Sequence, residues 1–257
     1  MTKPMFTQAI VRPPTPSMVE GLSEAQMGRP NYERALVQHE AYVDALRQCG
    51  LAVTHLPAAD EFPDACFVED VALITPQCAI LTRPGALTRR GEVALIEPVI
   101  RDRFSAVMTI TEPGTLEAGD VMMVGEHYYI GLSERTNQAG ADQLIDALVS
   151  VGLSGSVVTM SELLHLKTGV SYLEQNRMLV VGEFCQKAEF ADYDRFELES
   201  SDAYSANSVW INDTVLVPKG NERTSAAIKA WGYRLIELDM SEFQKLDGGL
   251  SCLSLRF

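Results

Sequence analysis

Five short β-prone segments recur along the chain, and each opens with a small or acidic residue. They begin at residues 70, 120, 169, 208 and 249, so the spacings are 50, 49, 39 and 41 residues. Such regular spacing is typical of internal structural repeats. The alternative is a set of five unrelated strands whose spacing is accidental. The segments cover residues 70–74, 120–124, 169–173, 208–211 and 249–253.

A similar succession of elements follows several of these segments. After the first, second and fourth, a second β-prone run is followed by an arginine-bearing loop and a helical stretch. The spacing of apolar residues predicts helices over residues 32–49, 92–104, 140–151 and 222–231. Units of this size cannot bury their own apolar faces, so they pack against one another. We therefore expect an α/β fold with five strand-and-helix repeats around a central axis, in one domain spanning residues 1–257.

The charge of the chain restricts the partners that it could bind. A formal net charge of −14 disfavours nucleic acids and anionic membrane surfaces, and it mildly favours cationic ligands. An acidic surface that serves only solubility is the alternative explanation. No apolar stretch approaches the roughly 20 residues that a membrane span needs, and the N-terminal residues lack the apolar segment of a signal peptide. We expect no nucleic-acid partner, no membrane partner and a cytoplasmic location.

Cysteine usage agrees with that location. The chain has five cysteines, which is an odd number, and they are widely separated along the sequence. This pattern suggests neither a disulfide framework nor a CxxC metal or redox pair. We expect the thiols to be reduced.

Most of the unusual polar residues lie at the starts of the repeated segments. A ring brings those starts together, so we expect their side chains to converge. Carboxylates at the edge of an apolar core are costly unless they meet a cation, and a guanidinium suits them because its N–H donors bind carboxylates in pairs. That guanidinium could belong to an internal arginine or to an external ligand. The residues are Asp64, Glu69, Asp70, Glu117, Asp120, His165, Lys167 and Cys252.

Cys252 and His165 supply the groups that nucleophilic catalysis requires. Cys252 follows the pair Gly248-Gly249, which indicates a segment whose backbone is closely approached on one side. A thiol can attack an electrophilic carbon, and a nearby histidine can donate a proton to a departing amine. Taken singly, each residue is also typical of a buried core, because free cysteine is among the most buried residue types.

At these positions the sequence closely resembles the dimethylarginine dimethylaminohydrolases, which belong to the pentein or guanidine-modifying superfamily. The resemblance runs nearly end to end, and several of its motifs are specific to this branch. It implies a five-fold pseudosymmetric α/β propeller, the pentein fold. The motifs include Phe62-Pro63-Asp64, Phe67-Val68-Glu69-Asp70, Thr82-Arg83-Pro84-Gly85, Glu117-Ala118-Gly119-Asp120, His165-Leu166-Lys167-Thr168-Gly169 and Asp247-Gly248-Gly249-Leu250-Ser251-Cys252.

Carried over by position, the resemblance implies a catalytic set around the guanidinium group. Cys252 is the nucleophile and His165 the general acid and base. Glu117 completes the catalytic set, and Glu69 and Asp70 join it as carboxylates around the guanidinium.

The resemblance also implies contacts to the amino-acid end of a substrate. Asp64 faces the α-ammonium group, and Arg89 and Arg135 hold the α-carboxylate. The backbone carbonyls of Leu22 and Leu246 make main-chain contacts, with Leu22 on a segment that resembles the mobile lid of the family.

The implied activity is hydrolysis of Nω-methylated arginines to citrulline and methylamine or dimethylamine, through a covalent S-alkylthiouronium on Cys252. This chemistry needs no metal and no organic cofactor, and the chain has no phosphate-binding GxxxxGK[ST] motif. The expected partner is a small-molecule substrate, and a homodimer is one assembly that we consider. Arginine deimination, amidino transfer and a non-catalytic methylarginine-binding module are the alternatives.

Overall fold

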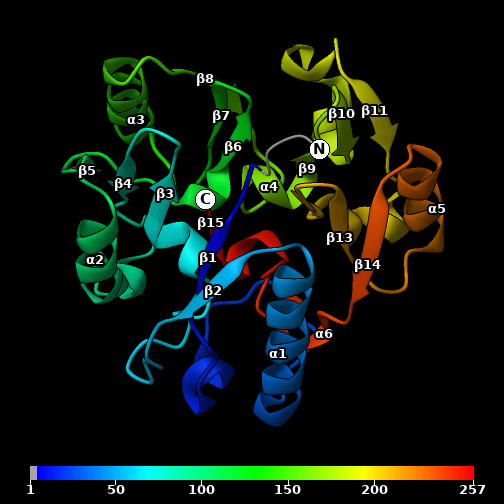
Figure 1. Cartoon of the computed structure of the whole chain (residues 1–257), viewed down its shortest axis with the longest axis horizontal. Helices are drawn as coiled ribbons and strands as arrows, with labels where there is room; N and C mark the ends of the chain where they lie inside the picture. Colours follow the sequence, from blue (N-terminus) through cyan, green and yellow to red (C-terminus); the bar gives the residue numbers. More distant parts are fainter. Residues whose placement is uncertain (1–4) are drawn as a thin grey trace.

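The chain folds into five small three-stranded sheets arranged around a common centre (Figure 1). The computed structural model describes residues 5–257. In every sheet the middle strand runs antiparallel to the first strand and parallel to the third. The predicted ring of five strand-and-helix repeats is therefore confirmed.

The first three sheets along the ring are β15–β1–β2, β3–β4–β5 and β6–β7–β8. Their strands are β15 (Leu255–Arg256), β1 (Gln8–Val11), β2 (Ala52–His55), β3 (Ala72–Ile74), β4 (Ala79–Leu81), β5 (Val107–Thr109), β6 (Val121–Val124), β7 (His127–Leu132) and β8 (Ser154–Thr159). The other two sheets are β9–β10–β11 and β12–β13–β14. Their strands are β9 (Val170–Tyr172), β10 (Arg177–Val180), β11 (Asp194–Glu197), β12 (Val209–Ile211), β13 (Thr214–Pro218) and β14 (Arg234–Leu238).

Four α-helices connect the parallel strands and lie at the periphery of the ring (Figure 1). All four predicted helices are present, with ends shifted by one or two residues. In the β9–β10–β11 unit the connection is made by two short 3-10 helices instead. The four helices are α1 (Tyr32–Gln48), α2 (Glu92–Arg103), α3 (Gln138–Ser150) and α5 (Glu222–Ala230).

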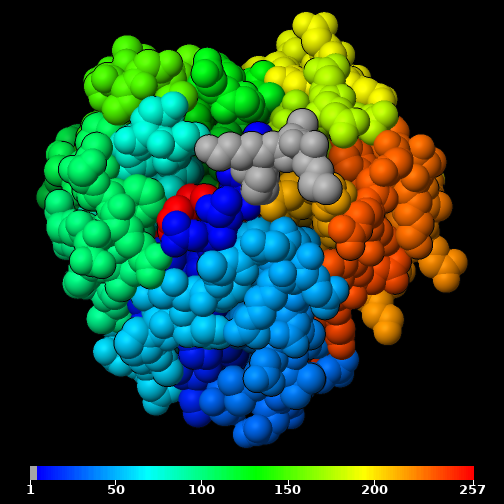
Figure 2. Space-filling model, in the orientation of Figure 1, coloured from blue at the N-terminus to red at the C-terminus, as the bar shows by residue number. Residues whose placement is uncertain are grey.

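The two ends of the chain build one unit together. β1 pairs antiparallel with β15, with Ala9 opposite Arg256 and Ile10 opposite Leu255. The amides of Thr7 and Gln8 both donate to the carbonyl of Phe257 at 2.8 Å. Figure 2 shows the first and last segments, dark blue and red, side by side near the centre of this face. The second strand of the fifth repeat is therefore β1, which the linear spacing of the repeats did not indicate.

Short helices lie at the polar starts of the repeats. The strands expected within residues 70–74, 120–124, 169–173 and 208–211 are present as β3, β6, β9 and β12, and the expectation of a strand at 249–253 is wrong, because that segment forms a 3-10 helix. The chain enters the first strand of each unit through η2 (Val68–Val71), η4 (Ala118–Asp120), α4 (Leu166–Gly169), η7 (Ser200–Ala206) and η8 (Ser251–Leu253). Cys252 thus lies in a 3-10 turn. Its own backbone amide donates to the carbonyl of Gly249 at 3.2 Å. An apolar run does not by itself distinguish such a turn from a strand. These short helices pack against one another around the axis.

Gly248 and Gly249 are required by packing between units. A Cβ atom on Gly248 would overlap the ring of Phe67, and one on Gly249 would overlap the side-chain amide of Asn207. The close approach that the sequence indicated therefore comes from neighbouring units of the ring.

Gly248→Ala should lower the free energy of unfolding by about 1–3 kcal/mol, because the added methyl group overlaps a buried aromatic ring. Gly155→Ala is the matched control, since its Cβ would meet only flexible side-chain ends at 3.2–3.4 Å. Denaturant unfolding measures both values. Equal effects in the two variants would contradict this explanation of Gly248.

Candidate active site

One cavity lies where the short entry helices converge, and it has an empty volume of about 470 Å³. Phe67, Leu164, Asp247 and Gly248 contribute to its wall. Nine of the ten predicted site residues line it. They are Leu22, Asp64, Asp70, Arg89, Glu117, Arg135, His165, Leu246 and Cys252.

His165 and Glu117 form a buried pair in this cavity. The imidazole Nε2 lies 3.0 Å from Glu117 Oε2, and the two residues are 8% and 1% exposed. Burial lowers the pKa of His165, but Asp120, Asp70 and the hydrogen bond to Glu117 outweigh it and raise the pKa to about 9. At neutral pH the imidazole is therefore protonated and can act first as an acid.

Cys252 is a neutral thiol at neutral pH. Burial, together with charge repulsion from Glu69 and Asp70, raises its pKa to about 12. The amide of Gly249 donates to its Sγ at 3.4 Å, which opposes that shift. A cation bound in the cavity would offset the carboxylates and lower the pKa of the thiol.

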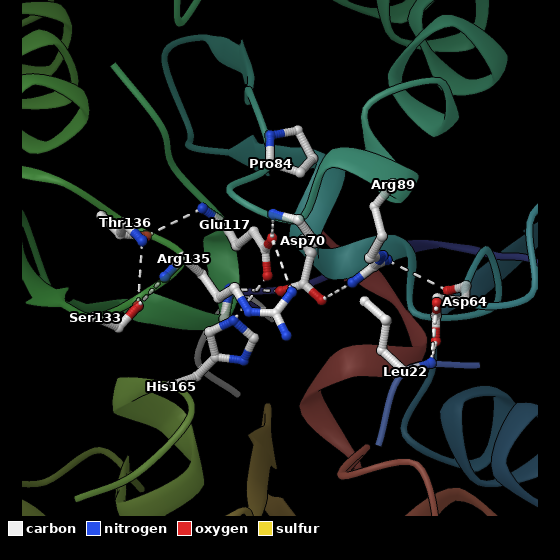
Figure 3. Close-up of polar contacts among 12 residues, drawn as sticks. Leu22, Asp64, Asp70, Pro84, Arg89, Glu117, Ser133, Arg135, Thr136 and His165 are labelled. Atoms are coloured by element: carbon white, nitrogen blue, oxygen red, sulfur yellow. Dashed lines mark hydrogen bonds and ion pairs between the residues drawn. The ribbon is translucent and has the colours of Figure 1, made fainter. Parts of the chain in front are cut away.

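Arg89 uses its donors within the protein. Its guanidinium donates to Asp70 Oδ2 at 2.6 Å and to both carboxylate oxygens of Glu92 at 2.8 and 3.0 Å. Its Nη2 also donates to the backbone carbonyl of Phe67 at 2.9 Å. Figure 3 shows Arg89 between Asp70 and Asp64. These contacts favour an internal role, in which Arg89 neutralises buried carboxylates and orients Asp70, over the predicted contact with a substrate α-carboxylate.

Arg135 differs from Arg89 in having few internal contacts. Its Nη1 lies 3.9 Å from Glu117 Oε1, and its side chain is 18% exposed. In Figure 3 it extends across the site above His165. Its remaining donors are therefore suited to an anionic group of a ligand.

Asp64 joins the cavity to the segment that follows the 3-10 helix η1 (Pro16–Glu20). The amide of Leu22 donates to Asp64 Oδ1 at 3.0 Å (Figure 3). The hydroxyl of Ser23 donates to the carbonyl of Lys245 at 2.6 Å. Burial raises the pKa of Asp64, and Arg89 opposes this. These contacts hold the predicted lid segment against the rim.

Glu69 is the predicted site residue that does not line this cavity. Its carboxylate contacts Lys167 Nζ at 2.7 Å and Arg256 Nη2 at 3.3 Å, and it accepts a hydrogen bond from Ser251 Oγ at 2.7 Å. These residues line a second cavity, with walls formed by the first strands of the repeats. Glu69 therefore acts on Cys252 through its charge and through Ser251, the neighbour of the thiol.

Sequence reasoning assigned no role to Ser251, Asn207 or Arg256. The side chain of Asn207 accepts from the Ser251 amide at 2.9 Å and donates to Ser251 Oγ at 3.0 Å. Asn207 precedes the fourth repeated segment, so its position in the repeat was a usable signal. For Arg256 the sequence offered no such signal, because its contact with Glu69 forms only when the two ends of the chain close the ring.

Asp70, Glu117 and His165 offer three potential metal-ligand atoms within 4.8 Å of one another. Asp70 already accepts from Arg89, and Glu117 from the amide of Ala86 at 3.0 Å. A protonated His165 cannot coordinate a metal ion. The three residues are better suited to a cationic organic ligand that donates hydrogen bonds.

A thiol, an imidazole and several carboxylates that line one cavity at the centre of a five-unit ring characterise the guanidine-modifying enzymes of the pentein class. The family model for arginine deiminase matches residues 57–245.

Two relatives identify the family within this class of enzymes. The N(G),N(G)-dimethylarginine dimethylaminohydrolase of Pseudomonas aeruginosa is 50% identical over 254 residues, which cover 98% of this chain and 100% of that protein. The enzyme of the same name from Streptomyces coelicolor is 34% identical and covers 97% of this chain and 96% of its own. The chain belongs to the dimethylarginine dimethylaminohydrolase family.

A solved structure agrees with this assignment. A cysteine-to-serine variant of the Pseudomonas aeruginosa enzyme in complex with citrulline superposes with a TM-score of 0.98. It is 50% identical and covers 98% of this chain and 100% of its own.

Arg89→Met should lower the free energy of unfolding by about 3–5 kcal/mol, because it leaves buried Asp70 and Glu92 without their cation. Arg135→Met is the matched control and should cost less than about 1 kcal/mol, since its ion pair is long. Chemical denaturation compares the two. A loss at Arg89 no larger than at Arg135 would refute the internal role.

Thiolate absorbance of the free protein should show Cys252 ionising well above the ordinary value of about 8.5. Glu69→Gln should lower this pKa, because it removes a nearby negative charge, whereas Glu97→Gln on α2 should leave it unchanged. Cys252→Ala identifies the signal. A wild-type thiol that ionises near pH 6 would contradict the assigned electrostatics.

Proposed function

We propose that this protein hydrolyses Nω-methylated arginines to citrulline and methylamine or dimethylamine. The observation that carries the proposal is the composition of the cavity. Its lining combines a buried thiol, Cys252, with several carboxylates and with a cationic side chain, Arg135, that has few internal partners. An amino acid with a guanidinium side chain matches this distribution. The names of the relatives support the same substrate class.

Each end of the substrate has partners of opposite charge. Asp70 and Glu117 accept hydrogen bonds from the guanidinium nitrogens. Glu69 adds negative charge from the second cavity, next to Ser251. At the other end Arg135 binds the α-carboxylate and Asp64 the α-ammonium group. Arg89 supports both ends, because it donates to the backbone carbonyl of Asp64 at 3.3 Å and to the carboxylate of Asp70 at 2.6 Å. The carbonyls of Leu22 and Leu246 add main-chain acceptors. The substrate is thereby fixed with its central guanidinium carbon at the thiol.

The reaction begins when the bound cation lowers the pKa of Cys252 and the thiol proton passes to solvent water. The thiolate attacks the central guanidinium carbon, and an S–C bond forms to give a tetrahedral adduct. His165 donates its proton to the substituted nitrogen, the C–N bond breaks, and methylamine or dimethylamine departs. An S-alkylthiouronium remains on Cys252.

Hydrolysis of this intermediate reverses the role of His165. The neutral imidazole takes a proton from water, and the oxygen attacks the same carbon. The C–S bond then breaks, Cys252 is released and reprotonated, and citrulline leaves. Asp70 and Glu117 stabilise the cationic character of the carbon in both steps.

Arginine deimination is the second candidate, because the arginine deiminase model covers most of the chain. The two reactions share every step except the leaving group, which is ammonia for arginine. Assays of the purified protein with arginine and with asymmetric dimethylarginine separate them when ammonia, dimethylamine and citrulline are measured. Dimethylamine release at the higher kcat/KM is expected, and a higher kcat/KM for ammonia release from arginine would refute our choice.

Cys252→Ser should abolish turnover while citrulline still binds, because the hydroxyl fits the site but is a much weaker nucleophile. Calorimetric titration with citrulline and an activity assay test this together. Undiminished turnover would remove the proposed nucleophile. A wild-type protein that binds methylarginine without turnover would instead indicate a non-catalytic binding module.

We also propose that residues 1–257 act as one catalytic domain in the cytoplasm, with a homodimer as the assembly to test by light scattering. All five cysteines are free, which fits a reducing compartment. Within residues 5–257, the helices are too short or too polar to cross a membrane.

A further inference from the structure

Asp120 is a fully buried carboxylate that does not line the substrate cavity. Its Oδ2 accepts hydrogen bonds from the hydroxyls of Ser133 and Thr136, both at 2.7 Å. Its Oδ1 accepts from the amide of Leu166 at 3.0 Å. A buried carboxylate is costly to maintain, so three short hydrogen bonds to two other segments call for an explanation.

Each hydrogen-bonded segment carries one residue of the proposed mechanism. Leu166 directly follows His165 and begins α4, so its amide fixes the point from which the imidazole projects. The hydroxyl of Ser133 also accepts from the amide of Arg135 at 3.0 Å. The hydroxyl of Thr136 also accepts from the amide of Glu117 at 3.1 Å. Figure 3 shows Ser133 and Thr136 beside Arg135 and Glu117.

The residue before Asp120 also contacts this site. A Cβ atom on Gly119 would lie 3.0 Å from the His165 ring and 2.8 Å from Asp70 Oδ1. The amide of Gly119 donates to Asp70 Oδ1 at 3.0 Å. The turn that carries Asp120 therefore supports one side of the imidazole directly.

We propose that Asp120 is a positioning residue for this reaction, which holds His165 as the proton donor and ties the Arg135 loop and Glu117 to it. The inference rests on the proposed function. Burial raises the pKa of Asp120, and among charged groups His165 opposes this most. Asp120 is in turn the largest favourable contribution to the charged form of His165. The two charges therefore stabilise each other.

The effect of the Asp120 charge on the pKa of His165 can be measured apart from the effects of the other nearby charges. Asp70 and Glu117 also favour the protonated imidazole, and their cationic partners are Arg89 and Arg135. On α4 itself, Lys167 is paired with Glu69. Asp120→Asn keeps all of these groups, and the amide keeps the shape of the carboxylate. The Thr136 hydroxyl accepts only the Glu117 amide and can accept a second hydrogen bond from the new amide, whereas the Ser133 hydroxyl already accepts from two backbone amides. The Leu166 and Thr136 contacts can therefore persist without the charge.

The first experiment titrates His165 by NMR of histidine-labelled protein, which has only four histidines, with His165→Gln to assign the signal. In Asp120→Asn, the midpoint for His165 should fall by about one to three pH units, because a nearby opposite charge is lost. At neutral pH, kcat should fall by about tenfold to a hundredfold with KM little changed. Asp142→Asn, on the exposed surface of α3, is the matched control and should alter neither value.

The second experiment tests the connection to Arg135. Ser133→Ala removes the hydroxyl shared by Asp120 and the Arg135 amide but keeps the charge of Asp120. KM for asymmetric dimethylarginine should rise about three- to tenfold, the contribution of one hydrogen bond, while the His165 midpoint stays in place. An unchanged KM would overturn the connection to the loop.

An Asp120→Asn protein with a wild-type His165 midpoint and unchanged kcat would overturn the proposal. If that variant does not fold, the wild-type titration decides, because a His165 midpoint at or below about 6.5 would show an imidazole that is neutral at neutral pH, and Asp120 could not then hold it as the proton donor. The NMR titration needs no substrate. A failure to hydrolyse methylarginine would therefore refute the proposed function without affecting this test.

Discussion

The active site depends on the pairing of β1 with β15. β15 contains only two residues, so it cannot form a stable sheet without β1 and β2. Once the three strands are joined, η8 is held against η2, and Cys252 is placed beside Asp70. The first strand of the chain thus helps to position the proposed nucleophile near its opposite end.

Within that ring, the electrostatics of the site come from carboxylates that are only partly neutralised. Arg89 balances two buried carboxylates, and Lys167 and Arg256 balance Glu69. What remains is a negative environment that favours a protonated His165 and opposes ionisation of Cys252. A cationic substrate relieves both effects at once, so the nucleophile becomes reactive mainly when the substrate is bound. This coupling would protect the resting thiol from unrelated electrophiles.

Much of this arrangement followed from repeat spacing and residue type. The five repeats and four helices were predictable because apolar periodicity and regular spacing are local properties of a sequence. One segment, residues 249–253, was taken for a strand although it forms the 3-10 helix η8, since both kinds of element are short and apolar. The missed second strands were β10, whose following segment lacks a helical pattern, and β1, which lies at the far end of the chain from its partner.

For the site, residue identity nominated Cys252, His165 and the acidic residues only together with their positions at the starts of the repeats, because a single thiol or imidazole is also typical of a buried core. Which of the site residues contact one another, and which keep donors for a ligand, depends on the folded ring. Only there does Arg89 turn inward to Asp70 and Glu92, while Arg135 keeps its donors available. Those differences depend on burial and on contacts between distant segments, which residue order along the chain does not encode locally.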